Sequence, residues 1–191
     1  MVRMNILNFA IDLINKDLFI SVTGALVASY IFLLIAFKPK MKIAKKICKL
    51  YWSPDPSTTP TTPWYVFKIV NKSIFSAFNI SVELNKIQTF ETDGGTNVRR
   101  TPINIVSSHL TSIPPYRPFW CWWAKNAEYA MQFRTAENLE AILAEDTSKL
   151  RIQITCSHGL TGLSKVKRME YAVESSIKSG RFKYGRNTEI V

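Results

Sequence analysis

The side chains that could carry out catalysis in this chain are few, and they do not form a catalytic set. The two histidines, His109 and His158, have no carboxylate or cysteine at a spacing typical of a triad or a metal site. Three cysteines, Cys48, Cys121 and Cys156, make an odd number without paired spacing, which is typical of a reducing compartment. We therefore expect no catalytic residue, metal ion or cofactor, and we interpret the protein as a non-enzyme.

An aromatic cluster is the most unusual feature outside the N-terminal region. Residues 114–123 read Pro-Pro-Tyr-Arg-Pro-Phe-Trp-Cys-Trp-Trp. On a strand, Trp120 and Trp122 face one side and Trp123 the other, so both faces are apolar. Three interpretations stay open: a strand buried on both faces, tryptophans at a membrane interface, and a ligand pocket where bases stack on aromatic rings.

Basic residues are the second candidate for ligand chemistry. The net charge is +11, and residues 164–191 hold seven basic and three acidic side chains. A basic face could meet phosphates, lipid headgroups or an acidic partner, and a solvated strand face explains the same residues. If there is a ligand site, its candidate residues are Trp120, Trp122, Trp123, Arg117, Lys165, Lys167 and Arg168.

The N-terminal region predicts a membrane anchor. Leu18 to Phe37 contains no charge over twenty residues, which as a helix spans about 30 Å, the thickness of a bilayer core. A cleaved signal would carry its basic residues before the apolar run, whereas here they follow it. A buried core helix remains the alternative. The six lysines after the run are predicted to lie at the membrane interface: Lys38, Lys40, Lys42, Lys45, Lys46 and Lys49.

The lysine-rich flank also predicts an orientation. Under the positive-inside rule this side stays cytoplasmic, so we expect a single-pass protein of the inner membrane with its C-terminal domain in the cytoplasm. Small residues let helices approach closely in lipid, so the bilayer and a second copy of the chain are expected partners. The predicted helix-packing residues are Ser21, Gly24, Ala25, Ala28 and Ser29.

Four regions follow from these patterns. Residues 1–17 are interpreted as a short interfacial segment or an extension of the span, and 18–37 as the transmembrane helix. Residues 38–63 are interpreted as a basic collar and a proline-rich linker, because four prolines within 54–63 favour extended geometry. Residues 64–191 are the predicted cytoplasmic β-domain.

Alternating apolar residues predict the strands of that domain. The expected strands are 64–70, 77–84, 103–106, 128–133, 150–156 and 165–171. Asn71 to Ser73 is expected to turn the first two into a hairpin, and Asp93 to Gly95 to make another turn. One helix is expected over 136–145 with Thr135 as its N-cap. The predicted fold class is mainly β: an N-terminal transmembrane helix, then an antiparallel β-sandwich or small barrel with one short helix.

The order of these segments gives a resemblance. Phe37-Lys-Pro-Lys-Met-Lys-Ile43, Tyr65-Val-Phe-Lys-Ile-Val-Asn-Lys-Ser73, Leu150-Arg-Ile-Gln-Ile-Thr155 with Gly159-Leu-Thr-Gly162-Leu-Ser164, and Ile177-Lys-Ser-Gly-Arg-Phe182 follow one another. The chain resembles small bacterial single-pass membrane proteins with a cytoplasmic β-domain. Its architecture is similar to membrane effectors of anti-phage systems, in which a cytosolic domain senses a nucleotide messenger and the membrane part disrupts the bilayer.

That resemblance implies a function, but it implies no binding residue. We expect a membrane-anchored sensor or effector whose β-domain binds a signal, such as a nucleotide messenger, and acts through oligomerised helices. The alternative is a membrane-tethered module that binds a protein partner. Nothing in the sequence points directly to DNA or RNA.

Overall fold

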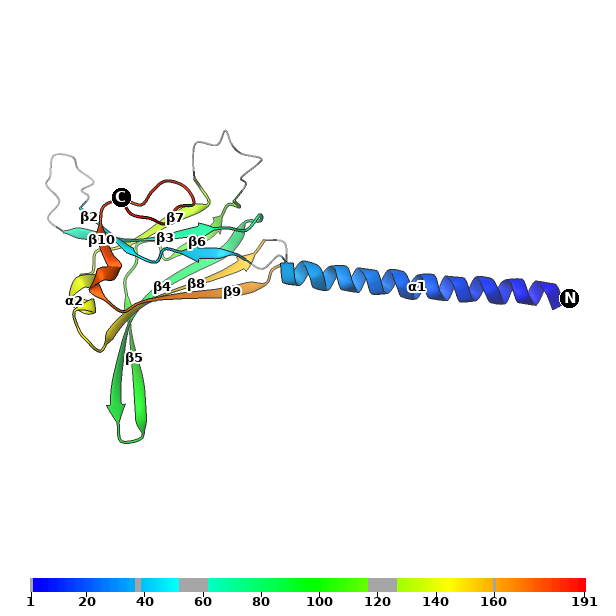
Figure 1. The fold of residues 1–191 in the computed structure, drawn as a ribbon, viewed down its shortest axis with the longest axis horizontal. Helices are drawn as coiled ribbons and strands as arrows, with labels where there is room; N and C mark the ends of the chain where they lie inside the picture. The colour runs from blue at the N-terminus through cyan, green and yellow to red at the C-terminus, as the bar shows by residue number, and fades with distance from the viewer. Residues whose placement is uncertain (1, 37–38, 52–61, 117–126, 160) are drawn as a thin grey trace. The chain divides into compact units, whose positions relative to one another are not determined.

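The first part of the structure is one long helix. The computed structural model describes residues 2–36, 39–51, 62–116, 127–159 and 161–191, and it divides into two units, Met1–Lys38 and Pro39–Val191. In the first unit, α1 runs from Val2 to Ala36 (Figure 1). The residues predicted as a short interfacial segment therefore continue the same helix, which was the second of the two expected forms.

The second unit is built of two β-sheets. Its elements are β1 (Met41–Ile43), β2 (Ile47–Tyr51), β3 (Pro63–Asn71), β4 (Ala77–Thr92), β5 (Gly95–Ile103), β6 (His109–Ile113), β7 (Ala130–Thr135), α2 (Leu139–Leu143), β8 (Ser148–His158), β9 (Ser164–Tyr171), η1 (Glu174–Ser176) and β10 (Ile177–Ser179). One sheet has the order β1-β3-β2-β10, with β7 also pairing β3. The other has the order β5-β4-β8-β9, with β6 also pairing β4. The strand pairs are antiparallel except β10 with β2.

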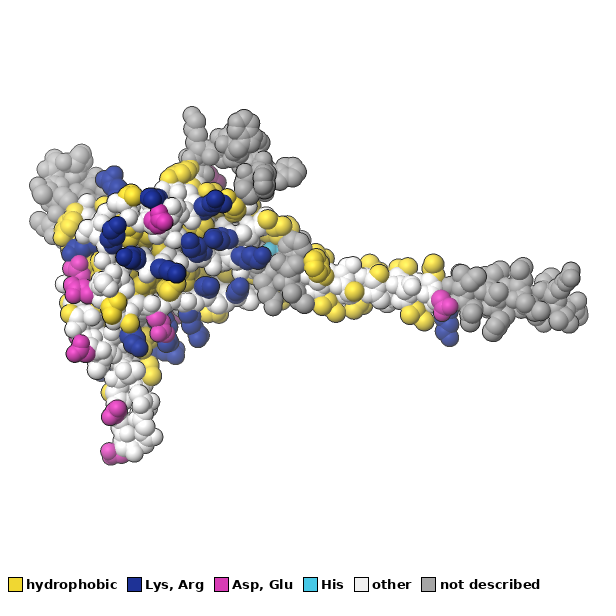
Figure 2. Space-filling model, viewed as in Figure 1, with side chains coloured by type: hydrophobic (Ala, Val, Ile, Leu, Met, Phe, Trp, Pro, Cys, Tyr) yellow, Lys and Arg dark blue, Asp and Glu magenta, His cyan; other side chains and the backbone are white. Residues whose placement is uncertain are grey.

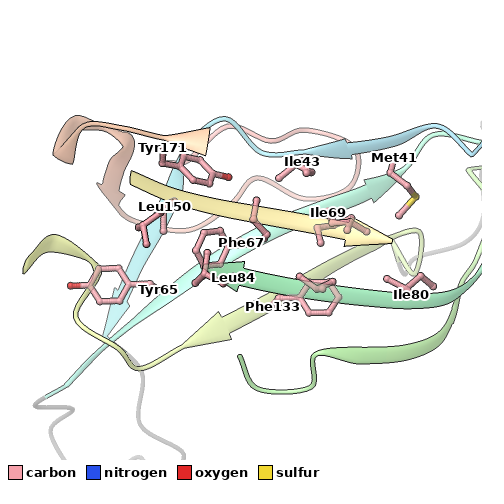
Figure 3. Close-up of a cluster of buried hydrophobic side chains, with 14 of the residues drawn as sticks. Met41, Ile43, Tyr65, Phe67, Ile69, Ile80, Leu84, Phe133, Leu150 and Tyr171 are labelled. Atoms are coloured by element: carbon pink, nitrogen blue, oxygen red, sulfur yellow. The ribbon is translucent and has the colours of Figure 1, made fainter. Parts of the chain in front are cut away.

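The two sheets enclose one main core, as Figure 3 shows. Tyr65, Phe67 and Ile69 alternate along β3 and point toward the second sheet, from which Leu84 and Leu150 come. Each of these side chains is at most 1% exposed, and burying one contributes about 1.5 to 3 kcal/mol. The expected fold class, a mainly β-domain with one short α-helix after an apolar helix, is confirmed.

Strand β3 is buried on its second face as well. Val66 packs there with Cys48 and with Ile190 and Phe182 of the C-terminal segment. Lys68, which is 2% exposed, also lies on β3. Its ammonium donates to the carbonyls of Lys183 at 2.6 Å and Asn187 at 2.8 Å. Burial lowers the pKa of Lys68. The C-terminal residues therefore cover the outer face of this sheet.

The β-domain begins before the expected boundary. Residues 38–63 were predicted to be a collar and linker, but they include β1 and β2, which supply the buried side chains Met41, Ile43, Ile47 and Cys48. In β1 the half-buried Lys42 stands between the buried Met41 and Ile43, so this short strand does not form an apolar run in the sequence. Residues 52–61 of the proline-rich stretch lie outside the described residues.

The predicted hairpin at Asn71 to Ser73 is wrong. Strands β3 and β4 belong to different sheets, so the segment between them crosses from one sheet to the other. The buried Asn71 amide holds this crossing by donating to the carbonyls of Phe75, Ile113 and Pro114. The second expected turn is confirmed, because Thr92 pairs with Gly95 across the β4–β5 hairpin.

The short helix is shorter than expected. It runs from Leu139 to Leu143, and the Asn138 side chain caps it by accepting from the Ala141 amide at 3.3 Å. Thr135, the expected N-cap, is 1% exposed within β7. The β7 strand thus includes the predicted N-cap, and the helix begins three residues later than expected. Strands β1, β2, β5, β6 and β10 were not predicted. Of the strand expected over 103–106, only Ile103, the last residue of β5, lies in a strand.

We expect residues 39–191 to fold without the helix and residues 64–191 not to fold. Removing β1 and β2 deletes four buried side chains worth about 6 to 12 kcal/mol together, comparable with the whole stability of a domain. Circular dichroism with thermal unfolding of the two fragments tests this expectation. An equally cooperative transition in the shorter fragment would contradict the boundary.

Candidate functional site

The apolar helix is the first candidate site. Its window Lys16–Leu33 has a mean hydropathy of 1.5 over 18 residues and is 0% buried. By length and composition it is sufficient to cross a membrane. Inside it the hydroxyl of Thr23 donates to the carbonyl of Phe19 at 2.7 Å, which satisfies that hydroxyl without water.

A shallow groove runs along one face of α1. Its volume is about 450 Å³, and the residues lining it are Phe19, Ile20, Thr23, Gly24, Val27, Ala28 and Ile31. Of the predicted helix-packing residues, Gly24 and Ala28 line this groove. Ser21, Ala25 and Ser29 do not, and at 100° per residue they form a separate stripe beside it. A Cβ added to Gly24 would meet no atom within 4 Å, so the helix itself does not require glycine there.

The six lysines predicted for the membrane interface do not form a uniform collar. Lys40, Lys45 and Lys46 are exposed. Lys49 instead pairs with Glu140 at 2.7 Å, and this hydrogen bond raises the pKa of the Lys49 ammonium. Lys42 is half-buried on β1. Lys38 lies outside the described residues.

The predicted ligand residues are not brought together by the described structure. Lys165 pairs with buried Cys156 and Lys167 with buried Ile154, so both lie on the core side of the edge strand β9. Arg168 lies on the opposite side, where its Nε donates to Gln153 Oε1 at 2.7 Å. Arg168 therefore lies on the other face of β9 from the two lysines. The other four candidates, Arg117, Trp120, Trp122 and Trp123, lie outside the described residues.

Two adjoining hollows offer a different site, the Trp64–Arg134 pocket. Their volumes are about 380 and 440 Å³, and they share Trp64 and Val106. The residues lining the first are Leu50, Trp64, Val66, Val106, Ser107, Leu110, Met131, Gln132, Phe133 and Arg134. The second adds Asn104, Ile105, Thr135, Ala136, Glu137 and Asn138.

Three separate parts of the fold position the residues of this pocket. Trp64 stands at the start of β3 and Arg134 near the end of β7, with the Arg134 guanidinium carbon 5.1 Å from the Trp64 ring centre. The segment after β5 joins them, because the Val106 amide donates to the Arg134 carbonyl at 2.9 Å. Ser107 follows with φ of 60°, which is uncommon for a residue with a side chain.

An aromatic ring, a guanidinium and polar side chains such as Gln132 in one hollow suit a planar or anionic ligand. Sequence reasoning missed this pocket because its residues are far apart in the chain. Trp64 is half-buried at the start of β3, and no local pattern in the sequence marks it as part of a pocket.

His158 is a core residue of the β-domain. His158 is 2% exposed and packs edge-on against Phe75, with 5.3 Å between ring centres. Burial lowers the pKa of His158, which favours a neutral ring. Among the residues whose positions are described, no three His, Cys, Asp or Glu side chains are grouped as metal ligands. Gly159 and residues 161–163 lie between β8 and β9.

Comparison with known proteins gives no family. No family model matches the chain, and no curated protein matches it. Among solved structures it is similar to Spo0M, a sporulation control protein from Bacillus subtilis, with 12% identity and a TM-score of 0.37 over 71% of this chain and 49% of that one. It is also similar to the putative ApaA protein from Bordetella pertussis, with 11% identity and a TM-score of 0.35 over 70% of this chain and 91% of that one. The chain spans about half the length of Spo0M.

We expect Gly24→Ile to weaken self-association of the full chain in vesicles. The larger side chain fills the groove and keeps a second helix away, at a cost on the order of 1 kcal/mol or about fivefold in the association constant. Energy transfer between labelled copies measures it. Val22→Ile, on another face of α1, is the control. Equal energy transfer in the two variants would show that this groove is not the contact.

Proposed function

We propose that the protein is a single-pass membrane protein of the inner membrane whose β-domain lies in the cytoplasm. The observation that carries this proposal is the complete exposure of the apolar window Lys16–Leu33. Exposed apolar surface costs about 25 cal/mol per Å² in water, and a bilayer removes that cost. The exposed lysines 40, 45 and 46 follow the helix closely and support the cytoplasmic side for the β-domain.

The β-domain acts in this proposal as a sensor or effector of an anionic signal. The Trp64–Arg134 pocket supports it, since a base can stack on an indole ring and a phosphate can pair with a guanidinium. A nucleotide messenger is the ligand class that combines both groups. Binding would change how the helices associate in the membrane, and the resemblance to anti-phage effectors implies a role in defence.

A second candidate function is protein recognition by the β4–β5 ribbon. The pairing of β4 with β8 ends at Gln88, and the ribbon continues to Thr92 paired only with β5 among the described strands (Figure 1). The outer edge of β5 is therefore open, and its stretch Gly95–Val98 has no charge or proline. An extended peptide can add to such an edge through backbone hydrogen bonds. This is the membrane-tethered interaction module.

Anchorage predicts how the full chain responds to extraction and protease. We expect alkaline carbonate to leave it in the membrane pellet and detergent to release it. Protease added outside intact spheroplasts should spare the β-domain, while protease added after lysis should digest it. Release by carbonate, or digestion from outside, would overturn the proposed anchor or its orientation respectively.

If the Trp64–Arg134 pocket binds a nucleotide, substitutions in the pocket should weaken that binding. We expect Trp64→Ala in residues 39–191 to weaken nucleotide binding by about 1 to 3 kcal/mol through lost stacking, and Arg134→Gln to weaken it through the lost positive charge. Calorimetry with a panel of cyclic and linear nucleotides measures both. Arg168→Gln, on the β9 strand, is the matched control. Absence of binding by any nucleotide, or equal losses in all three variants, would contradict the sensor function and favour the interaction module.

A further inference from the structure

One end of the β-sandwich gathers segments from across the chain, and we call it the Lys40 end. The register aligns Met41 with Asn71, and it aligns Ala77 with both His158 and Ile113. The segments that emerge beside one another there are 72–76, 114–116 and, after β8, Gly159 and 161–163. The Gly159 amide donates to the Ser76 carbonyl at 3.0 Å, which ties two of these loops together.

The loop 72–76 at this end is held firmly. The buried Asn71 amide donates to three carbonyls, and its oxygen accepts from the Ser73 amide at 2.9 Å. The Lys40 amide donates to the Ser73 hydroxyl at 2.7 Å, and the Lys72 amide donates back to the Lys40 carbonyl at 2.7 Å. This network fixes the direction in which the next residue, Ile74, projects.

The Ile74 side chain is exposed to solvent, although hydrogen bonds hold its loop in place. Its exposed fraction is 62%, and Phe78 and Leu163 nearby are 40% and 37% exposed. The Gly159 backbone lies so close to the Phe78 ring that an added Cβ would come within 2.6 Å of it. Exposed apolar side chains on a fixed loop need a contact outside the β-domain to leave water.

Cations predominate at the Lys40 end of the sandwich. They are Lys40, Lys72, Lys165 and Arg186, and Glu128 is the acidic residue beside them. Toward the other end the charges are mixed, and Glu140, Glu145 and Glu170 are paired there with Lys49, Lys86 and Arg151. In Figure 2 the magenta side chains are concentrated around α2 and the ribbon, while blue side chains dominate over β1 and β9.

We propose that the Lys40 end is a membrane-contact surface that rests on an anionic phospholipid bilayer, with Ile74 and Leu163 in the headgroup region. This proposal rests on the membrane anchorage proposed above. Lysines near an anionic leaflet are attracted to it, and apolar side chains at that depth leave water.

Chain connection favours the bilayer over a protein partner as the occupant. Only residues 37 and 38 lie between α1 and Pro39, and Lys40 is itself part of the surface. If α1 is in lipid, the chain brings this end next to the headgroups at high local concentration. A soluble protein partner would have to compete with the lipid headgroups for this surface.

An environment-sensitive label tests the contact in the full chain. Ile74→Cys and Leu163→Cys are made with Cys121→Ser, because Cys48 and Cys156 are buried, and each is labelled with a nitrobenzoxadiazole dye. Asp93→Cys at the ribbon tip is the matched control. In vesicles containing phosphatidylglycerol, we expect blue-shifted emission and several-fold stronger quenching by nitroxide lipids at positions 74 and 163 than at 93.

The outcomes distinguish failure of the membrane-contact surface from failure of the proposed membrane anchor. Lys40→Glu with Lys72→Glu, or vesicles of phosphatidylcholine alone, should reduce the quenching at position 74 while the protein still resists carbonate extraction. Equal weak quenching at 74, 163 and 93 in a carbonate-resistant protein overturns the membrane-contact surface and leaves the anchor intact. Release by carbonate overturns the anchor itself. Circular dichroism of each variant confirms that the exposed substitutions preserve the fold.

Discussion

Burial of β3 on both faces is the constraint on which the β-domain depends. One face of the strand needs the second sheet, and the other needs the β2 strand and the C-terminal segment, where Val66 meets Ile190 and Lys68 holds two carbonyls. An ammonium buried this deeply is tolerated only with hydrogen-bond acceptors in place. The residues directly after the helix and those near position 190 are thus part of the same packing unit, although they are far apart in the chain.

Antiparallel topology explains how the surface acquires two different ends. Each connection between antiparallel strands lies at one end of the sandwich or the other. The residue types in each loop therefore determine the surface chemistry of the end where that loop lies. The crossing at 72–76 and the turn at 159–163 carry apolar and basic residues, whereas the ribbon tip and the α2 region carry carboxylates. The buried amide of Asn71 links this arrangement to the core, because it fixes the crossing between the two sheets.

Local patterns were sufficient for part of the fold. Alternation found β8 and β9, and glycine with aspartate located the ribbon turn. The sequence did not reveal β1, because Lys42 interrupts an apolar strand that is only three residues long. Alternation alone places Lys167 and Arg168 on opposite faces of the strand, but which face is turned to the core depends on the pairing with β8, which the sequence did not reveal. The Trp64–Arg134 pocket joins residues seventy positions apart, and such contacts leave no local periodicity.

The edges of the second sheet have unequal protection. Lys165 and Lys167 point toward the interior side of β9, where a charged side chain discourages another strand from adding, while part of the β5 edge is unguarded. Growth by strand addition into an open-ended filament needs two complementary edges on each molecule. With the β9 edge blocked, copies that joined through their β5 edges would stop at a closed pair and would not grow into a fibre.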